Sequence, residues 1–218
     1  MTPETWTAVD HYVNSLLIPP DPGLDGAVRA STDAKLPPIA VSAAQGKLLH
    51  LLARIHGSRR ILEIGTLGGY STIWLARALP ADGQLISLEF DPHHADVARK
   101  NVASAGVSAK VDIRVGRAID LLPGLESGDP FDFVFVDADK PSTPDYFRWA
   151  MKLTRKGGII VVDNVVRAGE IVDASSRDEN IAGMRQFLDV LARERGADAT
   201  VIQTVGAKGY DGFALIVV

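Results

Sequence analysis

The sequence of 218 residues contains no cysteine. This absence excludes disulfides, thiolate zinc sites and thiol nucleophiles, and it fits a reducing compartment. No Lys or Arg precedes Arg29, so the chain lacks the charged start of a secretory signal and the Arg-rich character of a transit peptide. The longest apolar runs, such as Phe213 to Val218, are far too short to span a bilayer. We therefore expect a cytoplasmic protein with no membrane partner.

A strongly basic character is also missing. Lys and Arg total 23 against 27 Asp and Glu, which gives a net charge of -4. A nucleic-acid-binding domain usually presents a basic face, so we expect no nucleic-acid partner. The hydrophobic content of 46% over this length suits a single α/β domain spanning residues 1–218.

The third absence is the dinucleotide-binding pattern G-x-G-x-x-G. Residues 60–71 instead read as a strand, a glycine turn and a helix start, with Gly65, Gly68 and Gly69 in the order G-x-x-G-G. Glu63 precedes the first glycine, where a carboxylate would repel a diphosphate but suit a cationic ligand. Glu63 could also be a solvated residue at the strand end, although an unpaired carboxylate inside an apolar run is costly.

Two further strand ends carry residues suited to a nucleoside. The strand from Gln84 ends at Glu89, 26 residues after Glu63, where an acid commonly binds ribose hydroxyls in Rossmann-like folds. The strand Val111 to Val115 ends at Gly116-Arg117-Ala118, whose small residues leave room for a flat base. Ordinary turn chemistry explains Gly116 and Ala118 about equally well.

Polar side chains also follow two apolar runs that are typical of buried parallel strands. Asp137 ends the run from Phe131, and Asp163-Asn164 ends the run from Gly158. In an open α/β sheet the ligand crevice lies beyond the carboxyl ends of the strands. If these strands are neighbours, two carboxylates and an amide oxygen converge on a site suited to Mg²⁺. Asp163-Asn164 taken alone reads more readily as a turn.

Strands and helices alternate after Ile55, which predicts a Rossmann-like, doubly wound sheet of seven mostly parallel strands with helices on both faces and the last strand antiparallel. Residues 1–40 form an N-terminal helical segment that covers the acceptor side or makes a dimer contact. Its helix, Glu4 to Leu17, carries an apolar stripe that either packs on its own domain or contacts a second copy, and we expect a homodimer. Later helices are expected at Ser42 to Ile55, Asp91 to Asn101, Pro144 to Leu153 and Glu179 to Arg195, and the final strands at Ala199 to Val205 and Phe213 to Val218.

Taken together, these residues resemble the metal-dependent class I O-methyltransferases typified by caffeoyl-CoA and catechol O-methyltransferases. The resemblance extends from about Val41 to Asp211-Gly212. Each motif alone is modest, but their order and spacing make the set highly specific. The matching segments are Leu62-Glu63-Ile64-Gly65 with Gly68-Gly69-Tyr70-Ser71, Glu89, Gly116-Arg117-Ala118, Val136-Asp137-Ala138-Asp139-Lys140 and Asp163-Asn164.

The resemblance implies S-adenosylmethionine as methyl donor, a divalent cation such as Mg²⁺, Mn²⁺ or Ca²⁺, and a small phenolic acceptor of the catechol type. Lys140 would be the general base. The metal ligands would be Asp137, Asp163 and Asn164. The donor-binding residues would be Glu63, Gly65 and Ser71 near the methionine portion, Glu89 at the ribose, Ala118 at the adenine, Val41 through its backbone, and Asp137.

The metal and the base have a chemical purpose in such a reaction. A phenol has a pKa of about 10 and is mostly protonated near neutral pH. A divalent cation lowers the pKa of a bound hydroxyl and fixes two vicinal oxygens, so that one faces the methyl group. Lys140 is the candidate proton acceptor because none of the five His residues falls in the strand-end loops. The alternative for Lys140 is a solvated loop lysine paired with Asp139.

The sequence departs from its relatives in two segments that face the acceptor in the family. The plant caffeoyl-CoA enzymes carry an aromatic residue shortly after the Asp-Asn pair, where this chain has Val165-Val166-Arg167. The segment that contains Ile39 lacks the Met and Thr of several relatives. Arg167 and Ile39 are therefore candidate acceptor contacts, and Arg167 could bind a carboxylate on the acceptor or pack over the rim as an exposed side chain.

Two other functions compete with the methyltransferase. A nicotinamide-linked oxidoreductase lacks support because both G-x-G-x-x-G and a catalytic Tyr-Lys pair are missing. A non-catalytic module that binds S-adenosylmethionine is disfavoured because Asp137, Lys140, Asp163 and Asn164 are all present. The Asn/Asp-Pro-Pro-Tyr motif of amide and base N-methyltransferases is replaced by Asp137-Ala138-Asp139-Lys140.

Overall fold

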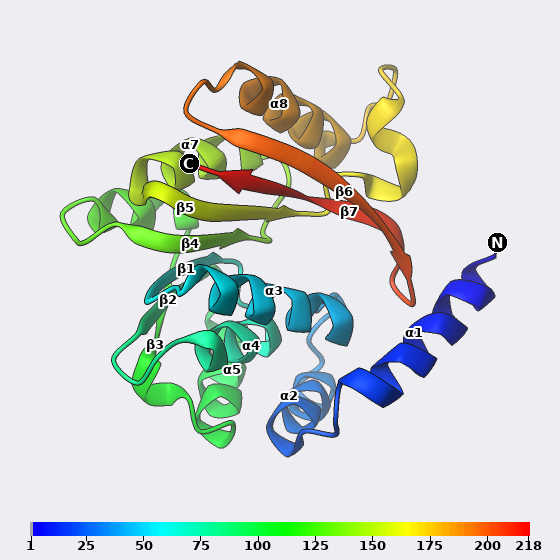
Figure 1. The fold of residues 1–218 in the computed structure, drawn as a ribbon, viewed down its shortest axis with the longest axis vertical. Helices are drawn as coiled ribbons and strands as arrows, with labels where there is room; N and C mark the ends of the chain where they lie inside the picture. The colour runs from blue at the N-terminus through cyan, green and yellow to red at the C-terminus, as the bar shows by residue number, and fades with distance from the viewer. Residues whose placement is uncertain (1) are drawn as a thin grey trace.

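The computed structural model describes residues 2–218, which form a seven-stranded sheet with helices on both faces (Figure 1). The strand order is β3-β2-β1-β4-β5-β7-β6. Six strands run in the same direction, and β7 alone runs antiparallel to its neighbours β5 and β6. The predicted fold class is confirmed. The strands are β1 Arg60–Ile64, β2 Gln84–Glu89, β3 Val111–Val115, β4 Phe131–Val136, β5 Thr154–Asp163, β6 Asp198–Gly206 and β7 Gly209–Val217.

Two hydrophobic cores enclose the central strands because successive side chains of a strand point to opposite faces. In β4, Phe133 and Phe135 pack against α3, α4 and α5, whereas Val134 and Val136 pack on the face of α6, α7 and α8. Figure 1 shows the two helical layers below and above the sheet. The helices are α1 Pro3–Leu17, α2 Pro22–Asp33, α3 Ala43–His56, α4 Tyr70–Ala78, α5 Pro92–Ser104, α6 Ala118–Leu121, α7 Thr143–Leu153 and α8 Glu179–Arg193, with short 3-10 helices η1 Ser108–Lys110, η2 Leu122–Leu125 and η3 Arg167–Val172.

The helix and strand bounds differ from the predicted ones by a few residues, except that α2, the short α6 and the 3-10 helices were not predicted. Asp21 caps α2 through its Oδ1, which accepts hydrogen bonds from Gly23 N and Leu24 N, and Pro22 occupies the first turn. Asp followed by Pro is a helix-start signal that the sequence displays. Leu24 and Ala27 of α2 are buried against the core that contains α4 and α5.

Helix α1 lies at the periphery of the fold, next to β6 and α3 (Figure 1). None of its fifteen described residues is buried. Asp10 anchors it to the turn between β6 and β7, because Asp10 Oδ2 accepts a hydrogen bond of 2.7 Å from Ala207 N. Tyr12, Leu16 and Leu17 are each more than 60% exposed. The exposure of these three side chains argues against packing on the same domain, and the dimer contact stays a prediction.

Among residues 2–218, no helix is both long enough and apolar enough to cross a membrane.

Candidate active site

Asp137 and Asp163 lie at the ends of adjacent strands. β4 and β5 are parallel neighbours, with Val136 opposite Val162, so the two carboxylates that follow stand level with each other. Asp163 is only 4% exposed. Burial raises its pKa above the usual range, and the charge of Asp137 raises it further. The predicted convergence of the two strand ends is confirmed, and it concentrates negative charge at one point.

Asn164, the third predicted ligand, directly follows Asp163. Its backbone has a φ of 57°, in the left-handed region that Asn tolerates better than most residues, and its N–H donates to Asp163 Oδ1 at 2.8 Å. In the described part of the chain, no group of three or more His, Cys, Asp or Glu side chains could hold a metal. Two carboxylates and an amide nevertheless fit a hard divalent cation, whose charge would relieve the repulsion between Asp137 and Asp163.

Lys140 reaches back to the metal-ligand candidates. Its Nζ lies 2.9 Å from Asp137 Oδ1, and the residue is only 8% exposed. Asp139 does not pair with it, because Asp139 accepts hydrogen bonds from the Tyr146 hydroxyl at 2.5 Å and from Ser142 N at 3.2 Å. The alternative of a solvated lysine paired with Asp139 is therefore wrong. The ammonium is held where it contacts the group that would ligate the metal.

Two glycines let other elements approach the backbone of this loop. A Cβ on Gly183 of α8 would stand 2.4 Å from Lys140 O, and a Cβ on Gly65 would stand 2.0 Å from Asp137 O. Neither distance is compatible with a side chain. Gly65 also has a φ of 98°, which L side chains rarely adopt. The backbone that carries Asp137 and Lys140 is thus fixed between the turn after β1 and α8.

Glu63 is completely buried beneath the glycine turn. Its carboxylate accepts hydrogen bonds from the hydroxyls of Ser71 at 2.6 Å, Thr72 at 2.5 Å and Ser87 at 2.6 Å. Burial raises the pKa of Glu63 to about 7 despite these bonds. The interpretation of Glu63 as a solvated strand-end residue is therefore wrong. The three hydroxyls satisfy the hydrogen-bonding capacity of a carboxylate that would otherwise be buried and unpaired.

Glu89 also engages the glycine turn. Its Oε2 accepts hydrogen bonds from Thr66 N at 3.1 Å and Leu67 N at 2.7 Å, and its Oε1 accepts one from Asp91 N at 2.9 Å. His94 Nδ1 lies 3.6 Å from Glu89 Oε1, so one histidine stands beside a strand-end acid after all. Glu89 thereby links the ends of β1 and β2.

Phe90 is a feature that the sequence reasoning missed. It directly follows Glu89 and is 71% exposed, which is unusual for a large aromatic side chain. An exposed ring beside the candidate ribose acid can cover a flat base. The signal was available, since a large aromatic residue directly follows the strand-end acid Glu89 in the sequence.

The other candidate contacts lie at the start of helices. Ala118 is buried and begins α6 two residues after Gly116, whose φ is 149°. Val41 is buried and stands just before Ser42, which caps α3 by accepting a hydrogen bond from Gln45 N at 3.2 Å. Ile39 is 68% exposed, so it is available to a ligand or a partner.

A cavity of about 240 Å³ adjoins the candidate metal ligands. Its walls include Asp163, Asn164 and Gln45, and the turn between β6 and β7 closes another side. Asp211, which the sequence analysis noted without a role, also lines it. Arg167 is not among the lining residues. The cavity therefore stands on the side of Asp163 and Asn164 that faces α3 and the hairpin.

Arg167 begins η3 with a φ of 52°. Its Nε is buried and has no hydrogen-bond partner among the described residues. The hydrogen bonds from Asn180 lower the pKa of Asp178, and the positive charge of Arg167 lowers it further. The guanidinium charge thus stabilises the carboxylate of Asp178 at the start of α8.

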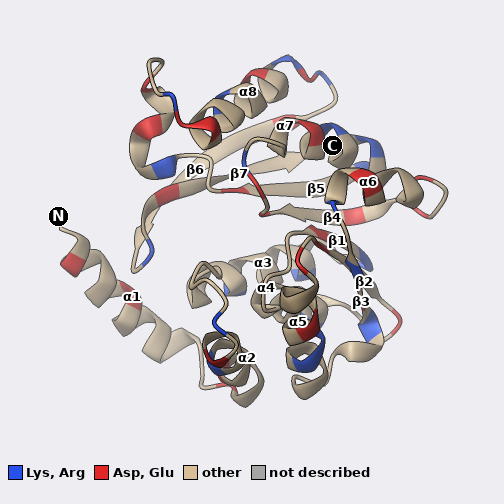
Figure 2. Cartoon of the chain, turned by 180° about the vertical axis from the view of Figure 1, so that it is seen from behind, with Lys and Arg blue, Asp and Glu red and all other residues tan. Residues whose placement is uncertain are grey.

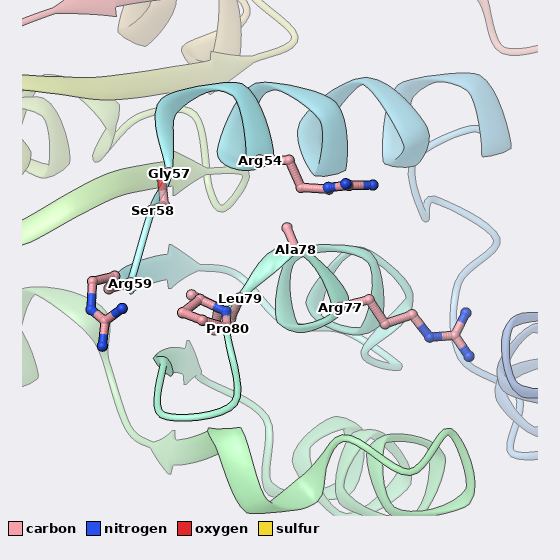
Figure 3. A pocket seen from close by; sticks show the side chains of 8 residues that line it. All are labelled: Arg54, Gly57, Ser58, Arg59, Arg77, Ala78, Leu79 and Pro80. Atoms are coloured by element: carbon pink, nitrogen blue, oxygen red, sulfur yellow. The ribbon is translucent and has the colours of Figure 1, made fainter.

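A separate cavity of about 440 Å³ lies at the opposite end of the strands, near the starts of β1 and β2 (Figure 3). Three arginines line it, and two of them already have carboxylate partners: Arg59 pairs with Asp82, and Arg77 pairs with Asp21. Arg54 and Arg77 occupy the last turns of α3 and α4, where a positive charge interacts favourably with the negative end of the helix dipole. These arginines have structural roles, and none of the candidate site residues reaches this cavity.

Residues 21–216 match the model of a protein family described as O-methyltransferase. The chain is 49% identical over 220 residues to a catechol O-methyltransferase of Niastella koreensis, covering 100% of both chains. It is 52% identical over 210 residues to a catechol O-methyltransferase of Mycobacterium tuberculosis, covering 96% of this chain and 94% of that protein.

A solved structure agrees with these relatives. The O-methyltransferase of Bacillus cereus in complex with SAH superposes with a TM-score of 0.98 at 51% identity, covering 100% of both chains. The fold, including the order of its elements, is therefore that of a methyltransferase.

Proposed function

Because the chain belongs to the O-methyltransferase family, we propose that it transfers the methyl group of S-adenosylmethionine to one hydroxyl of a catechol-like acceptor, with the help of a divalent cation. The single observation that carries the metal-assisted part is the pairing of Asp137 and Asp163 at adjacent strand ends. Burial and then the charge of Asp137 raise the pKa of Asp163, and a bound cation would lower this pKa again.

The glycine turn and the ends of β1 and β2 would hold the donor. A sulfonium is a cation, and the buried carboxylate of Glu63 beneath Gly65 and Ser71 provides a complementary charge. Glu89 would bind the ribose hydroxyls with the lone pairs left by its backbone donors. Phe90 and Ala118 would border the adenine. Names of two catechol-methylating relatives and the SAH complex of a third protein support this arrangement.

Asp137, Asp163 and Asn164 would hold the cation, with Mg²⁺ as the first candidate and Mn²⁺ or Ca²⁺ as others. When bound, such an ion lowers the pKa of a coordinated hydroxyl and orients it. Lys140 is buried 2.9 Å from Asp137 Oδ1, so its amine stands within reach of an acceptor hydroxyl beside the site. Lys140 would accept the hydroxyl proton as the oxygen attacks the methyl carbon and the C–S bond breaks.

Neither competing function has a structural observation in its favour. A nicotinamide-linked oxidoreductase would need a pyrophosphate site, whereas the glycine turn covers the carboxylates of Glu63 and Glu89. A non-catalytic binding module would have no need to bury Lys140 against Asp137.

We also propose that the protein works as a homodimer in the cytoplasm. The exposed face of α1 carries the apolar side chains Tyr12, Leu16 and Leu17. No Lys or Arg side chain lies on α1 (Figure 2). β6 exposes Val201, Ile202 and Val205 at the edge of the sheet. Exposed apolar surface of this extent is typical of an interface.

The test of the proposed reaction is a methyl-transfer assay with matched acceptors. A catechol should be methylated in the presence of Mg²⁺, and excess chelator should abolish turnover. The corresponding monophenol should react far more slowly, because it loses one metal bond and the orientation that the second oxygen provides. Equal rates for catechol and monophenol, or full activity in chelator, would contradict metal chelation.

A further inference from the structure

We infer that Asp211 is a positioning residue that holds the metal-ligand loop, residues 164–168, in its active geometry from the neighbouring strand β7. The inference rests on the proposed metal role of Asp163 and Asn164. It concerns a residue outside the proposed ligand and base set.

One carboxylate oxygen of Asp211 gathers three backbone donors. Asp211 Oδ1 accepts hydrogen bonds from Val166 N at 3.1 Å, Arg167 N at 2.9 Å and Gly212 N at 2.9 Å. Two of these donors belong to the loop that follows Asn164. Because three hydrogen bonds converge on this one oxygen, a single side chain fixes the path of the loop.

The loop needs such a restraint because its backbone is unfavourable. Asn164, Arg167 and Ala168 all have φ values between 52° and 57°. Residues other than glycine adopt this left-handed region only when the surroundings force it, and Arg and Ala tolerate it less well than Asn. The loop would relax to ordinary φ values if its tether were removed, and Asn164 lies at its start.

A second contact joins the same two segments. Val165 N donates to Gly212 O at 2.9 Å, which continues the pairing of Asp163 with Phe213 on β7. A Cβ on Gly212 would stand 2.4 Å from Ile202 O and 2.6 Å from Val166 Cγ2, so only glycine fits between β6 and the loop. Asp211 and Gly212 thus act together. The glycine lets the loop approach β7 closely, and the carboxylate holds the loop there.

The position of Asp211 explains why it would act through geometry. It lines the 240 Å³ cavity together with Asp163 and Asn164, yet one of its oxygens is already committed to backbone donors. Residues that orient metal ligands from behind typically change metal affinity by about 10–100-fold when they are replaced. Donor binding takes place at the ends of β1 and β2, away from this loop, and should not depend on Asp211.

Two substitutions separate geometry from charge. Asp211→Asn keeps an oxygen acceptor at the same reach and removes the charge, whereas Asp211→Glu keeps the charge and displaces the acceptor by one methylene. Calorimetry of Mg²⁺ binding, with S-adenosylhomocysteine present, should show Mg²⁺ affinity about 10-fold or more weaker in Asp211→Glu and little changed in Asp211→Asn. The affinity for S-adenosylhomocysteine should stay within about twofold in both, which also verifies folding.

Asp132→Glu is the matched control. Asp132 Oδ2 also accepts hydrogen bonds from two backbone donors, Arg59 N at 2.7 Å and Arg60 N at 2.8 Å, but at the opposite end of the strands. Its replacement should leave Mg²⁺ affinity unchanged. Amide hydrogen exchange in metal-free protein gives an independent measure, because Asp211→Glu should accelerate exchange at Val166 and Arg167.

The possible failures are distinct. If Asp163→Ala leaves Mg²⁺ affinity intact, the proposed metal site is wrong and this inference falls with it. If Asp163→Ala abolishes Mg²⁺ binding while Asp211→Glu does not weaken it, the metal site stands and the role of Asp211 is wrong. A loss of Mg²⁺ affinity in Asp211→Asn that Asp211→Glu does not share would show that the charge of Asp211 matters and would overturn the positioning role.

Discussion

The Nζ atom of Lys140 lies 2.9 Å from Oδ1 of Asp137, although Asp139 is the closer acid in sequence. Asp139 is occupied by the hydroxyl of Tyr146 and the amide of Ser142. Burial, followed by the bond to Asp139 and its charge, raises the pKa of Tyr146 far above the usual range, so this hydroxyl remains a donor. The loop therefore directs its lysine to the metal-ligand candidate.

Replacing Lys140 by Ala should lower kcat by about 10²–10⁴, the range typical of a lost general base. The affinity for S-adenosylhomocysteine should change little, because the residue lies on the acceptor side of the proposed site. Steady-state kinetics and calorimetry measure the two effects. Lys152→Ala removes an exposed lysine paired with Glu126 and serves as the control. A near-normal kcat across pH 6 to 9, roughly the range in which a tuned base titrates, would exclude Lys140 as the base.

The two candidate acidic ligands should differ in what they control. Asp163→Ala should abolish turnover and Mg²⁺ binding but preserve much of the donor affinity, because Asp163 faces the cavity next to α3. Asp137→Ala should weaken both Mg²⁺ and donor binding, because Asp137 follows β4 beside the glycine turn, where Gly65 contacts its backbone. Calorimetry with Mg²⁺ and with S-adenosylhomocysteine separates the two patterns. Identical effects of both substitutions on donor affinity would contradict this division of roles.

Much of the site could be predicted because strand order places strand ends together. Asp137 and Asp163 each end an apolar run, and the rule that ligands bind beyond the carboxyl ends of parallel strands brings them to one edge. Their pairing required only that β4 and β5 be neighbours, which the structure confirms. The fold class followed from the same alternation of strands and helices.

What could not be predicted depends on side-chain partners from distant segments. The hydroxyls around Glu63 come from two elements, and Ser87 lies 24 residues away on β2. The hydrogen bond from Val166 N to Asp211 Oδ1 joins residues that are 45 positions apart in the sequence. Periodicity carries no information on such contacts. Helix α2 was missed for another reason, since its signal, Asp21-Pro22, was present but its apolar pattern is short.

The titration of Glu63 should make the free energy of unfolding depend on pH. Its pKa is raised from 4.5 to about 7 in the folded protein, so between these values the folded state holds a proton that the unfolded state has lost. The contribution of Glu63 to the free energy of unfolding is therefore fully present below pH 4.5 and falls as pH rises through about 7. The total loss is on the order of 3 kcal/mol.

Glu63→Gln should remove this slope, because glutamine does not titrate. Chemical denaturation at several pH values, with chelator and without donor, measures the free energy of unfolding for both proteins. Asp163 contributes a slope of the same sign, so the difference between wild type and variant is the informative quantity. Glu126→Gln at an exposed position is the control. Parallel pH profiles for wild type and Glu63→Gln would refute the assignment.

The exposed face of α1 gives a prediction on assembly. Leu16 and Leu17 are 63% and 68% exposed, so replacing both by Glu should cost the isolated chain little but place charge inside an interface. Sedimentation velocity should show a dimer for the wild type and a monomer for the double variant. Ile55→Glu, at an 82% exposed position on α3, should remain dimeric. A monomeric wild type at micromolar concentration would exclude the homodimer.

The last prediction concerns the choice of acceptor. Arg167 begins η3 only three residues after Asn164, and its buried Nε has no hydrogen-bond partner among the described residues. We expect catechols with a carboxylate side chain to have a higher kcat/KM than neutral catechols, by about 10- to 100-fold, because a charge-assisted bond contributes about 1.5–3 kcal/mol. Arg167→Ala should remove this preference and leave neutral catechols unaffected.

Asp178 provides the complementary test of the same idea. Its negative charge attracts Arg167, since Arg167 helps to lower the pKa of Asp178 after the hydrogen bonds from Asn180. Asp178→Asn should therefore free the guanidinium and increase the preference for acidic catechols, whereas Arg148→Ala, on the exposed face of α7, should change nothing. The ratio of kcat/KM for matched acidic and neutral catechols measures all three variants. If the wild type has the same kcat/KM for acidic and neutral catechols, Arg167 serves only the packing of η3 against α8. Acceptor selectivity would then have to arise from the walls of the cavity beside Asp163.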